Sequence, residues 1–201
     1  MNTLSEIAEI LKRQKSAVIF THMRPDGDTL GSAMALSRAL FMLKIRNEVV
    51  NEGEIPEKFL FLDGMRGIRR EPSMTDADAY ICVDSSDEAR LGAAQTAFLA
   101  GARKGKVTVN IDHHVSNTRF CRYNFVRPRA SNCENIAELI SLLGVRPDAV
   151  MAGYLLTGMI TDSGAFSHGD VNGDTFRGGI CRRCGRRRRK DHLRGIQKTV
   201  Q

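Results

Sequence analysis

The chain has 201 residues, of which 42% are hydrophobic and 26% are charged. This length and composition suffice for one buried core, and no apolar run is long enough to span a bilayer. The N-terminal segment lacks the basic region and apolar stretch of a signal peptide, and the five cysteines do not have the spacing of a disulfide framework. We therefore expect a cytoplasmic protein that does not bind membranes.

The formal net charge of +7 is concentrated in one segment. Residues 177–201 contain ten of the 30 Lys and Arg residues and one of the 23 Asp and Glu residues, a net charge of +9. Residues 1–176 therefore hold 20 basic and 22 acidic residues, a net charge of −2. The overall basicity thus says nothing about the partner of the larger segment.

Strand and helix patterns alternate along residues 1–176. Residues 16–21 form an apolar run without polar alternation, which is typical of a strand buried in a parallel sheet. Apolar residues at helical spacing, such as Leu4, Ile7 and Leu11, indicate helices between the strands. This order predicts an α/β fold with a mostly parallel sheet flanked by helices on both faces. We expect strands at residues 16–21, 46–51, 78–83, 106–111 and 122–126, and helices at 4–13, 32–43, 56–62, 88–102, 132–143 and 147–160.

The turn from the first strand to the next helix carries His22, Asp26 and Asp28. It lies at the carboxyl end of the sheet, where open α/β proteins bind ligands. Gly27 separates the two aspartates, and we expect it to let the backbone bend so that both carboxylates face nearby points. One imidazole and two carboxylates are ligands for a divalent metal, although a polar turn of this composition also occurs in ordinary loops.

Three further groups follow predicted elements in the same way. Asp84 and the pair His113 and His114 come directly after strands, and Asp162 follows a helix. Because parallel strands end at one edge of the sheet, these groups can converge there. Carboxylates packed together raise each other's pKa, and divalent cations offset that repulsion. A carboxylate and imidazole set without thiols suits Mn²⁺, and two ions about 3.5–4 Å apart are typical of phosphoester hydrolysis. Each residue taken alone could equally be a turn residue.

The order of these motifs resembles that of a known family. The motifs are His-x-x-x-Asp-Gly-Asp-x-x-Gly-Ser from His22, Val-Asp-Ser-Ser-Asp from Val83, Asp-His-His-x-x-Asn from Asp112 and Thr-Asp-Ser-Gly-x-Phe from Thr161. They resemble the DHH phosphoesterase superfamily, and in particular the bacterial oligoribonuclease and 3′-phosphoadenosine-5′-phosphate phosphatases, also called nanoRNases. The resemblance covers residues 18–166.

This resemblance implies a role for each residue. One Mn²⁺ would be held by His22, Asp26 and Asp84, and a second by Asp28, Asp84, His113 and Asp162, with Mg²⁺ or Co²⁺ as alternative ions. A water between the metals would attack phosphorus, and His114 would stabilise the charge that develops on a phosphate oxygen. Asp112 would orient an imidazole. Weaker candidates for substrate contact or support are Asn117, Ser32 and Arg90, each with a structural role as the alternative.

The resemblance also implies substrates and suggests competing functions. The family cuts short oligoribonucleotides to nucleoside 5′-monophosphates and hydrolyses 3′-phosphoadenosine 5′-phosphate. Alternatives within the superfamily are a cyclic dinucleotide phosphodiesterase and a manganese-dependent inorganic pyrophosphatase. An alternative of another class is a non-catalytic fragment or an RNA binder with a basic tail. A homodimer is compatible with the sequence.

The resemblance stops near residues 175–177, where the family continues into a linker helix and a second domain. We therefore expect a catalytic domain at residues 1–176 and a basic tail at 177–201. Cys181, Cys184 and His192 supply at most three ligands, so a zinc site is discounted. The tail is rich in Arg, Gly and Cys, and we favour a frameshift or truncation as its origin. We expect retained metal binding but impaired turnover of dinucleotides, because substrate positioning would be lost.

Overall fold

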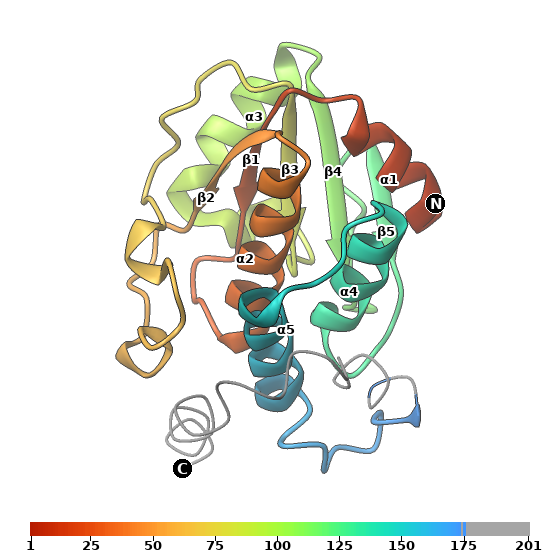
Figure 1. Ribbon diagram of the computed structural model, residues 1–201. Helices are drawn as coiled ribbons and strands as arrows, with labels where there is room; N and C mark the ends of the chain where they lie inside the picture. The colour runs from red at the N-terminus through yellow and green to blue at the C-terminus, as the bar shows by residue number, and fades with distance from the viewer. Residues whose placement is uncertain (174, 176–201) are drawn as a thin grey trace.

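The computed structural model describes residues 1–173 and 175, so the tail predicted at 177–201 lies outside the described residues. A five-stranded sheet in the order β2-β1-β3-β4-β5 forms the centre, and every neighbouring pair of strands is parallel. The strand arrows point the same way in Figure 1. The strands are β1 (Ser16–Phe20), β2 (Arg46–Val50), β3 (Ala79–Val83), β4 (Val107–Asp112) and β5 (Tyr123–Val126).

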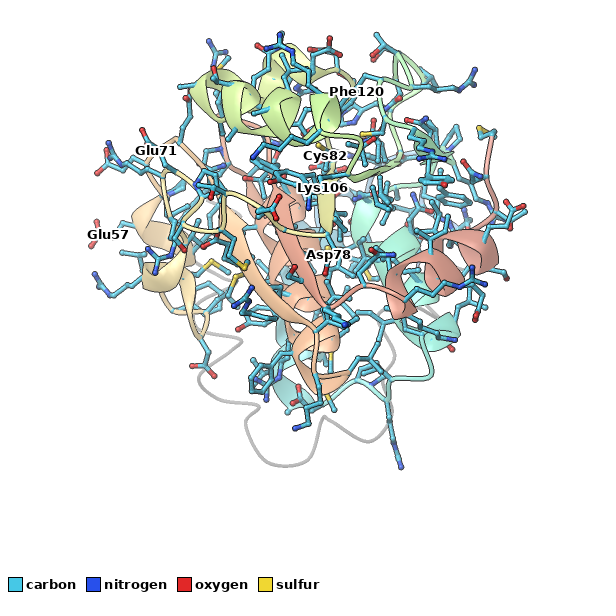
Figure 2. All side chains as sticks on the ribbon, turned by 90° about the horizontal axis from the view of Figure 1, so that it is seen from above. Glu57, Glu71, Asp78, Cys82, Lys106 and Phe120 are labelled. Carbon is cyan, nitrogen blue, oxygen red and sulfur yellow. The ribbon has the colours of Figure 1, made fainter. Side chains whose placement is uncertain are left out.

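Helices cover both faces of the sheet, as the sequence predicts. One face packs against α1 (Leu4–Lys12), α2 (Gly27–Met42), α4 (Asn132–Leu142) and α5 (Ala149–Asp162). The other face packs against η3 (Glu88–Ala94) and α3 (Gln95–Arg103). Figure 1 shows α2, α4 and α5 on the near side and α3 behind the sheet. Cys82 and Phe120 belong to the second apolar cluster and lie on the α3 side in Figure 2.

The burial of β1 and β3 on both faces explains their unbroken apolar sequences. Every residue of these two strands is buried. Parallel strands need crossover connections, and the helices that make them cover the sheet. The strand order reverses direction beside β1, because the chain first adds β2 on one side and then β3 on the other. Ligands in open α/β sheets bind at such a switch point.

Two predicted helices differ from the observed ones. The short helix expected at 56–62 is a single 3₁₀ turn, η1 (Glu57–Phe59), followed by η2 (Met65–Gly67). The helix expected at 88–102 is divided into η3 and α3, because Gly92 has φ 61° and ψ −138° inside it. No helix in the described part of the chain is both long and apolar enough to cross a membrane.

The boundaries of α2 and α5 also differ from the prediction, and both differences change the site. Helix α2 begins at Gly27 rather than at Ser32, because the Asp26 carboxylate accepts hydrogen bonds from the N–H groups of Asp28 and Thr29, both 3.0 Å long. This is the capping interaction that Asp commonly makes at a helix start. Helix α5 extends through Asp162 instead of ending before Thr161. Two of the predicted metal ligands are therefore helical residues.

Candidate functional site

The carboxyl edge of the sheet brings the predicted site residues together. His22 follows β1, Asp84 follows β3, and His113 and His114 follow β4. The start of α2 and the end of α5 supply the remaining carboxylates. The side chains form three groups, and within each group the possible ligand atoms lie within 4.8 Å of one another. The groups are His22, Asp26 and Asp84; Asp28, His113 and Asp162; and Asp84, Asp112, His113 and His114.

The first group surrounds the ring of His22. Its Nε2 atom lies 3.5 Å from an oxygen of Asp26 and 3.5 Å from Oδ2 of Asp84. The ring is only 3% exposed, yet neither ring nitrogen has a hydrogen-bond partner within the described structure. Burial lowers the pKa of His22, but the carboxylates of Asp26 and Asp84 outweigh burial and raise the pKa to about 9. The ring nitrogen is thus directed at two anionic oxygens without bonding to either.

The second group surrounds Nε2 of His113. This atom lies 3.8 Å from Oδ2 of Asp28 and 3.7 Å from Oδ2 of Asp162. Burial raises the pKa of Asp28 to about 7, with further contributions from the nearby charges of Asp84 and Asp162. Burial also raises the pKa of Asp162 to about 6. Two carboxyl groups thus resist ionisation because their surroundings are buried and acidic.

Asp84 lies between the two groups and faces both. Its Oδ2 atom is 3.5 Å from His22, and its Oδ1 atom is 3.3 Å from Nε2 of His113. The side chain is 2% exposed, and Oδ1 has no hydrogen-bond partner in the described part of the chain. Burial raises the pKa of Asp84, but His113 and His22 lower it well below its usual range. The backbone of Asp84 has φ 54°, a left-handed conformation that is uncommon outside glycine and clusters at functional sites.

Helix α4 holds the Asp28 carboxylate from the opposite side. Its N-cap residue Ser131 donates a 2.7 Å hydrogen bond to Oδ1 of Asp28. The backbone N–H groups of Asn132 and Cys133 also donate to this carboxylate, at 2.5 and 2.9 Å. The sequence predicts a helix at 132–143, but it does not predict that the N-terminus of this helix binds Asp28. A buried carboxylate at a helix N-terminus is a favourable arrangement.

The carbonyl oxygen of Arg129 fixes the orientation of His113. It accepts a 2.9 Å hydrogen bond from Nδ1, so Nε2 is left to face the carboxylates. The Arg129 guanidinium is itself held by Glu138, at 2.5 Å, and by Glu134, at 3.5 Å. The sequence does not identify Arg129, since a backbone carbonyl carries no residue-specific signal.

His114 forms a separate pair with Asp112. Its Nδ1 atom donates a 2.8 Å hydrogen bond to Oδ1 of the fully buried Asp112, and this bond raises the pKa of His114. The ring remains 31% exposed, so one edge of it faces solvent at the site. Asn117 donates a 2.6 Å hydrogen bond to the other oxygen of Asp112 and a 2.7 Å bond to Asn110. Asn117 therefore has a structural role in the site.

Ser32 is placed away from any phosphate, whereas the backbone of Arg90 supports the loop of the site. Ser32 is inside α2 rather than at its N-terminus, and it is fully buried with its hydroxyl 3.5 Å from the Cys133 sulfur. It is therefore neither a helix cap nor exposed to a phosphate. The backbone carbonyl of Arg90 accepts a 2.7 Å hydrogen bond from the N–H of Met23, which ties η3 to the loop that follows β1.

Close packing of α2 against α5 brings Asp162 to the site. A Cβ atom at Gly27 would overlap the Thr161 side chain, and one at Gly31 would lie 2.5 Å from the Tyr154 carbonyl oxygen. A Cβ atom at Gly158 would also overlap the Cys133 sulfur. The expectation that Gly27 provides a bend is wrong: Gly27 is the first residue of α2 and has no positive φ. Its missing side chain allows two helices to approach.

The donor set fits divalent cations. The groups contain carboxylate oxygens and imidazole nitrogens, and the neighbouring Cys133 thiol has a pKa raised well above its usual value by burial. Both ring nitrogens of His22 and Oδ1 of Asp84 are buried and have no hydrogen-bond partner among the described residues. Buried polar atoms without partners are costly, and cations would satisfy Nε2 of His22 and Oδ1 of Asp84 while offsetting the repulsion among the carboxylates.

Comparison with known proteins shows related chains. A protein of Thermus thermophilus named bifunctional oligoribonuclease and PAP phosphatase NrnA is 32% identical over 173 residues, which are 85% of this chain and 51% of that protein. A Streptococcus mutans protein named a probable manganese-dependent inorganic pyrophosphatase is 27% identical over 154 residues, 73% of this chain and 47% of that protein. The chain spans about half the length of these relatives.

A solved structure and a family model match most of the chain. The crystal structure of an exopolyphosphatase-related protein from Bacteroides fragilis superposes with a TM-score of 0.81 and 23% identity, covering 98% of this chain and 61% of the other. At this identity the likeness shows a shared fold. The model of the DHH family N-terminal domain matches residues 16–159, which include β1 to β5 and most of α5. The chain therefore belongs to the DHH family.

Proposed function

We propose that this chain is a metal-dependent phosphoesterase that hydrolyses short oligoribonucleotides and 3′-phosphoadenosine 5′-phosphate. The observation that carries the proposal is the position of Asp84, whose two carboxylate oxygens face different groups of ligand atoms. The identity to the Thermus thermophilus relative supports this choice of substrates.

In this proposal the site holds two divalent cations, with Mn²⁺ as the preferred ion. One is bound by His22, Asp26 and Asp84, and the other by Asp28, Asp84, His113 and Asp162. When bound, such ions lower the pKa of a water molecule to make it a nucleophile and polarise the phosphoryl oxygens. All the ligands except Asp26 have limited exposure, which keeps the charged groups in a medium of low dielectric constant where they interact strongly.

The protein's own residues contribute orientation and a proton donor. The Arg129 carbonyl keeps the Nδ1 proton of His113 in place, so Nε2 stays available as a ligand. Asp112 keeps the ring of His114 in one orientation and favours its protonated form. In the proposal, the exposed edge of His114 donates to a phosphate oxygen and stabilises the charge that develops there.

Inorganic pyrophosphate is a second candidate substrate. The relative from Streptococcus mutans favours it, since that protein is named for this activity. Both substrates place a phosphorus atom beside the same ligand cluster, so the cluster does not discriminate between them. A panel of pyrophosphate, a dinucleotide and 3′-phosphoadenosine 5′-phosphate with the same metal-loaded protein separates the candidates by relative kcat/KM.

The test uses Asp84→Asn with Asp76→Asn as its matched control. Asp76 is 72% exposed and pairs with Lys106 just before β3, away from the carboxyl edge. The Mn²⁺-loaded parent and Asp76→Asn should hydrolyse the nucleotide substrates at equal rates, even where turnover of dinucleotides is impaired, and Mn²⁺ should raise the unfolding temperature of both proteins. Asp84→Asn should lose both effects. Nucleotide hydrolysis that persists in Asp84→Asn, or a parent on which Mn²⁺ has no effect, would refute the proposal.

A further inference from the structure

A pocket of about 350 Å³ adjoins the metal-ligand cluster on its α5 side. Its volume is within the range of about 300–1,000 Å³ that is usual for small-molecule sites. Asp26 and Asp162 form part of its wall, so the pocket opens beside the cluster. The other lining residues are Gly27, Lys58, Phe59, Ile160, Thr161, Gly164 and Ala165. The pocket thus joins the start of α2, the end of α5 and η1.

Among the residues that the structure describes, Lys58 is the one basic residue that lines this pocket. No carboxylate in the described part of the chain lies within ion-pair distance of its ammonium group, although other lysines such as Lys12 and Lys106 are paired. Its ammonium lies 5.1 Å from the centre of the Phe59 ring. A lysine without an anionic partner among the described residues therefore lines the pocket beside the cluster.

The backbone around Lys58 is anchored, although its side chain is exposed. Phe59 is 1% exposed and packs in the main apolar cluster. Its N–H donates a 2.9 Å hydrogen bond to the carbonyl of Pro56, which closes the 3₁₀ turn. This turn holds Lys58 at the pocket wall. Ala165, which also lines the pocket, has φ 56°, a left-handed conformation that is uncommon for residues with a side chain and recurs at functional sites.

The charges of the pocket favour an anionic occupant once metals are bound. Asp26 and Asp162 are metal ligands in the proposed function, so their charges would be offset by the cations. Lys58 would then give the pocket a net positive charge. A lysine ammonium is an established type of contact for phosphate groups. The substrates proposed above carry a phosphate close to the one that reacts.

We propose that this pocket binds the non-reacting phosphate of the substrate, with Lys58 as its cationic contact. The inference rests on the proposed function and adds to it a preference for nucleotides that carry two phosphates. A 3′,5′-bisphosphate should accordingly be a better substrate than a nucleoside 3′-monophosphate, although both release the same 3′-phosphate.

The experiment compares adenosine 3′,5′-bisphosphate with adenosine 3′-monophosphate in the Mn²⁺-loaded chain. The variants are Lys58→Gln, which removes the charge, and Lys58→Arg, which keeps it. Lys15→Gln, at the opposite edge of the sheet beside the start of β1, is the matched control. Calorimetric titration with adenosine 5′-monophosphate and with adenosine provides a readout that needs no turnover.

Lys58→Gln should reduce the preference for the bisphosphate by about tenfold through KM and leave hydrolysis of the 3′-monophosphate unaffected, since only the bisphosphate offers a second phosphate for a charge-assisted hydrogen bond. Lys58→Gln should also weaken the binding of adenosine 5′-monophosphate relative to that of adenosine. Lys58→Arg and Lys15→Gln should keep both the preference for the bisphosphate substrate and the preference for adenosine 5′-monophosphate in binding. An unchanged preference in Lys58→Gln, or equal losses on both substrates, would overturn the inference. A parent that hydrolyses neither substrate but shows Lys58-dependent binding would refute the proposed function alone.

Discussion

Nδ1 of His113 lies 2.9 Å from the carbonyl oxygen of Arg129, sixteen residues further along the chain. The same turn continues into Ser131, which donates a hydrogen bond to Asp28. One short segment before α4 therefore holds an imidazole from β4 and a carboxylate from α2. Groups that orient metal ligands in this way support metal binding, and their mutation typically lowers metal affinity by about 10–100-fold.

Ser131→Ala should separate these two effects. Loss of the N-cap hydroxyl should destabilise the protein by about 1 kcal/mol, and loss of the bond to Asp28 should weaken Mn²⁺ binding about tenfold. Thr3→Ala is the matched control, because Thr3 caps α1 in the same manner, far from the site along the chain. Chemical denaturation and Mn²⁺ titration measure the two quantities. Equal metal affinities in both variants would show that the Ser131 hydroxyl does not support Asp28.

Gly27→Ala should destabilise the protein by about 1–3 kcal/mol, because the new methyl group overlaps the Thr161 side chain. Thr161→Ala removes the two side-chain atoms that come nearest to it, so the double variant should recover part of the loss. Urea unfolding of the four proteins gives the coupling energy. Gly67→Ala is the control, since no atom lies within 4 Å of the Cβ position there. A neutral Gly27→Ala would mean that α2 and α5 do not need this close contact.

Stability of the metal-free protein should fall as the pH rises from 6 to 8.5. The folded-state pKa of Asp28 is about 7, above its unfolded value near 3.8, so its contribution is present at low pH and is lost by about pH 7. The pKa values of His22 and His113 are raised from 6.5 to about 9 and about 10, so their contributions begin to fall above pH 6.5.

Mn²⁺ should reverse this pH dependence, because metal binding displaces protons and its affinity rises with pH. Thermal unfolding with EDTA and with Mn²⁺ across pH 6–8.5 measures both trends. The gap between the two unfolding temperatures should widen with pH. A gap that stays constant would mean that metal binding does not compete with the protons of this cluster.

Asp112→Asn should lower the pKa of His114, because the Asp112 carboxylate raises it in the parent. If protonated His114 donates to the phosphate, the alkaline limb of the pH–rate profile should move to lower pH. His114→Gln should remove that limb and lower kcat by about 10²-fold or more. Profiles of kcat with saturating Mn²⁺ make the comparison. An alkaline limb that Asp112→Asn does not move would assign it to another group.

The sequence predicts the strands better than the helix ends. β1 and β3 are buried on both faces, so nearly all their residues are apolar and the sequence shows them as unbroken apolar runs. Helix ends depend on capping contacts that the pattern of apolar residues does not contain. The start of α2 was therefore expected too late, and the turn at η1 was expected to be a longer helix.

The sequence by itself determined the α/β fold, the parallel sheet and the positions of the polar residues that follow its strands, because hydrophobic periodicity and the alternation of strands with helices along the chain can be recognised from local segments. Only the tertiary structure decided how those residues are held and what lies beside them. The contact of the Arg129 carbonyl with His113, the overlap that forbids a side chain at Gly27 and the place of Lys58 in the pocket join segments distant in sequence. Such contacts arise from packing in three dimensions, which no local pattern of residues records.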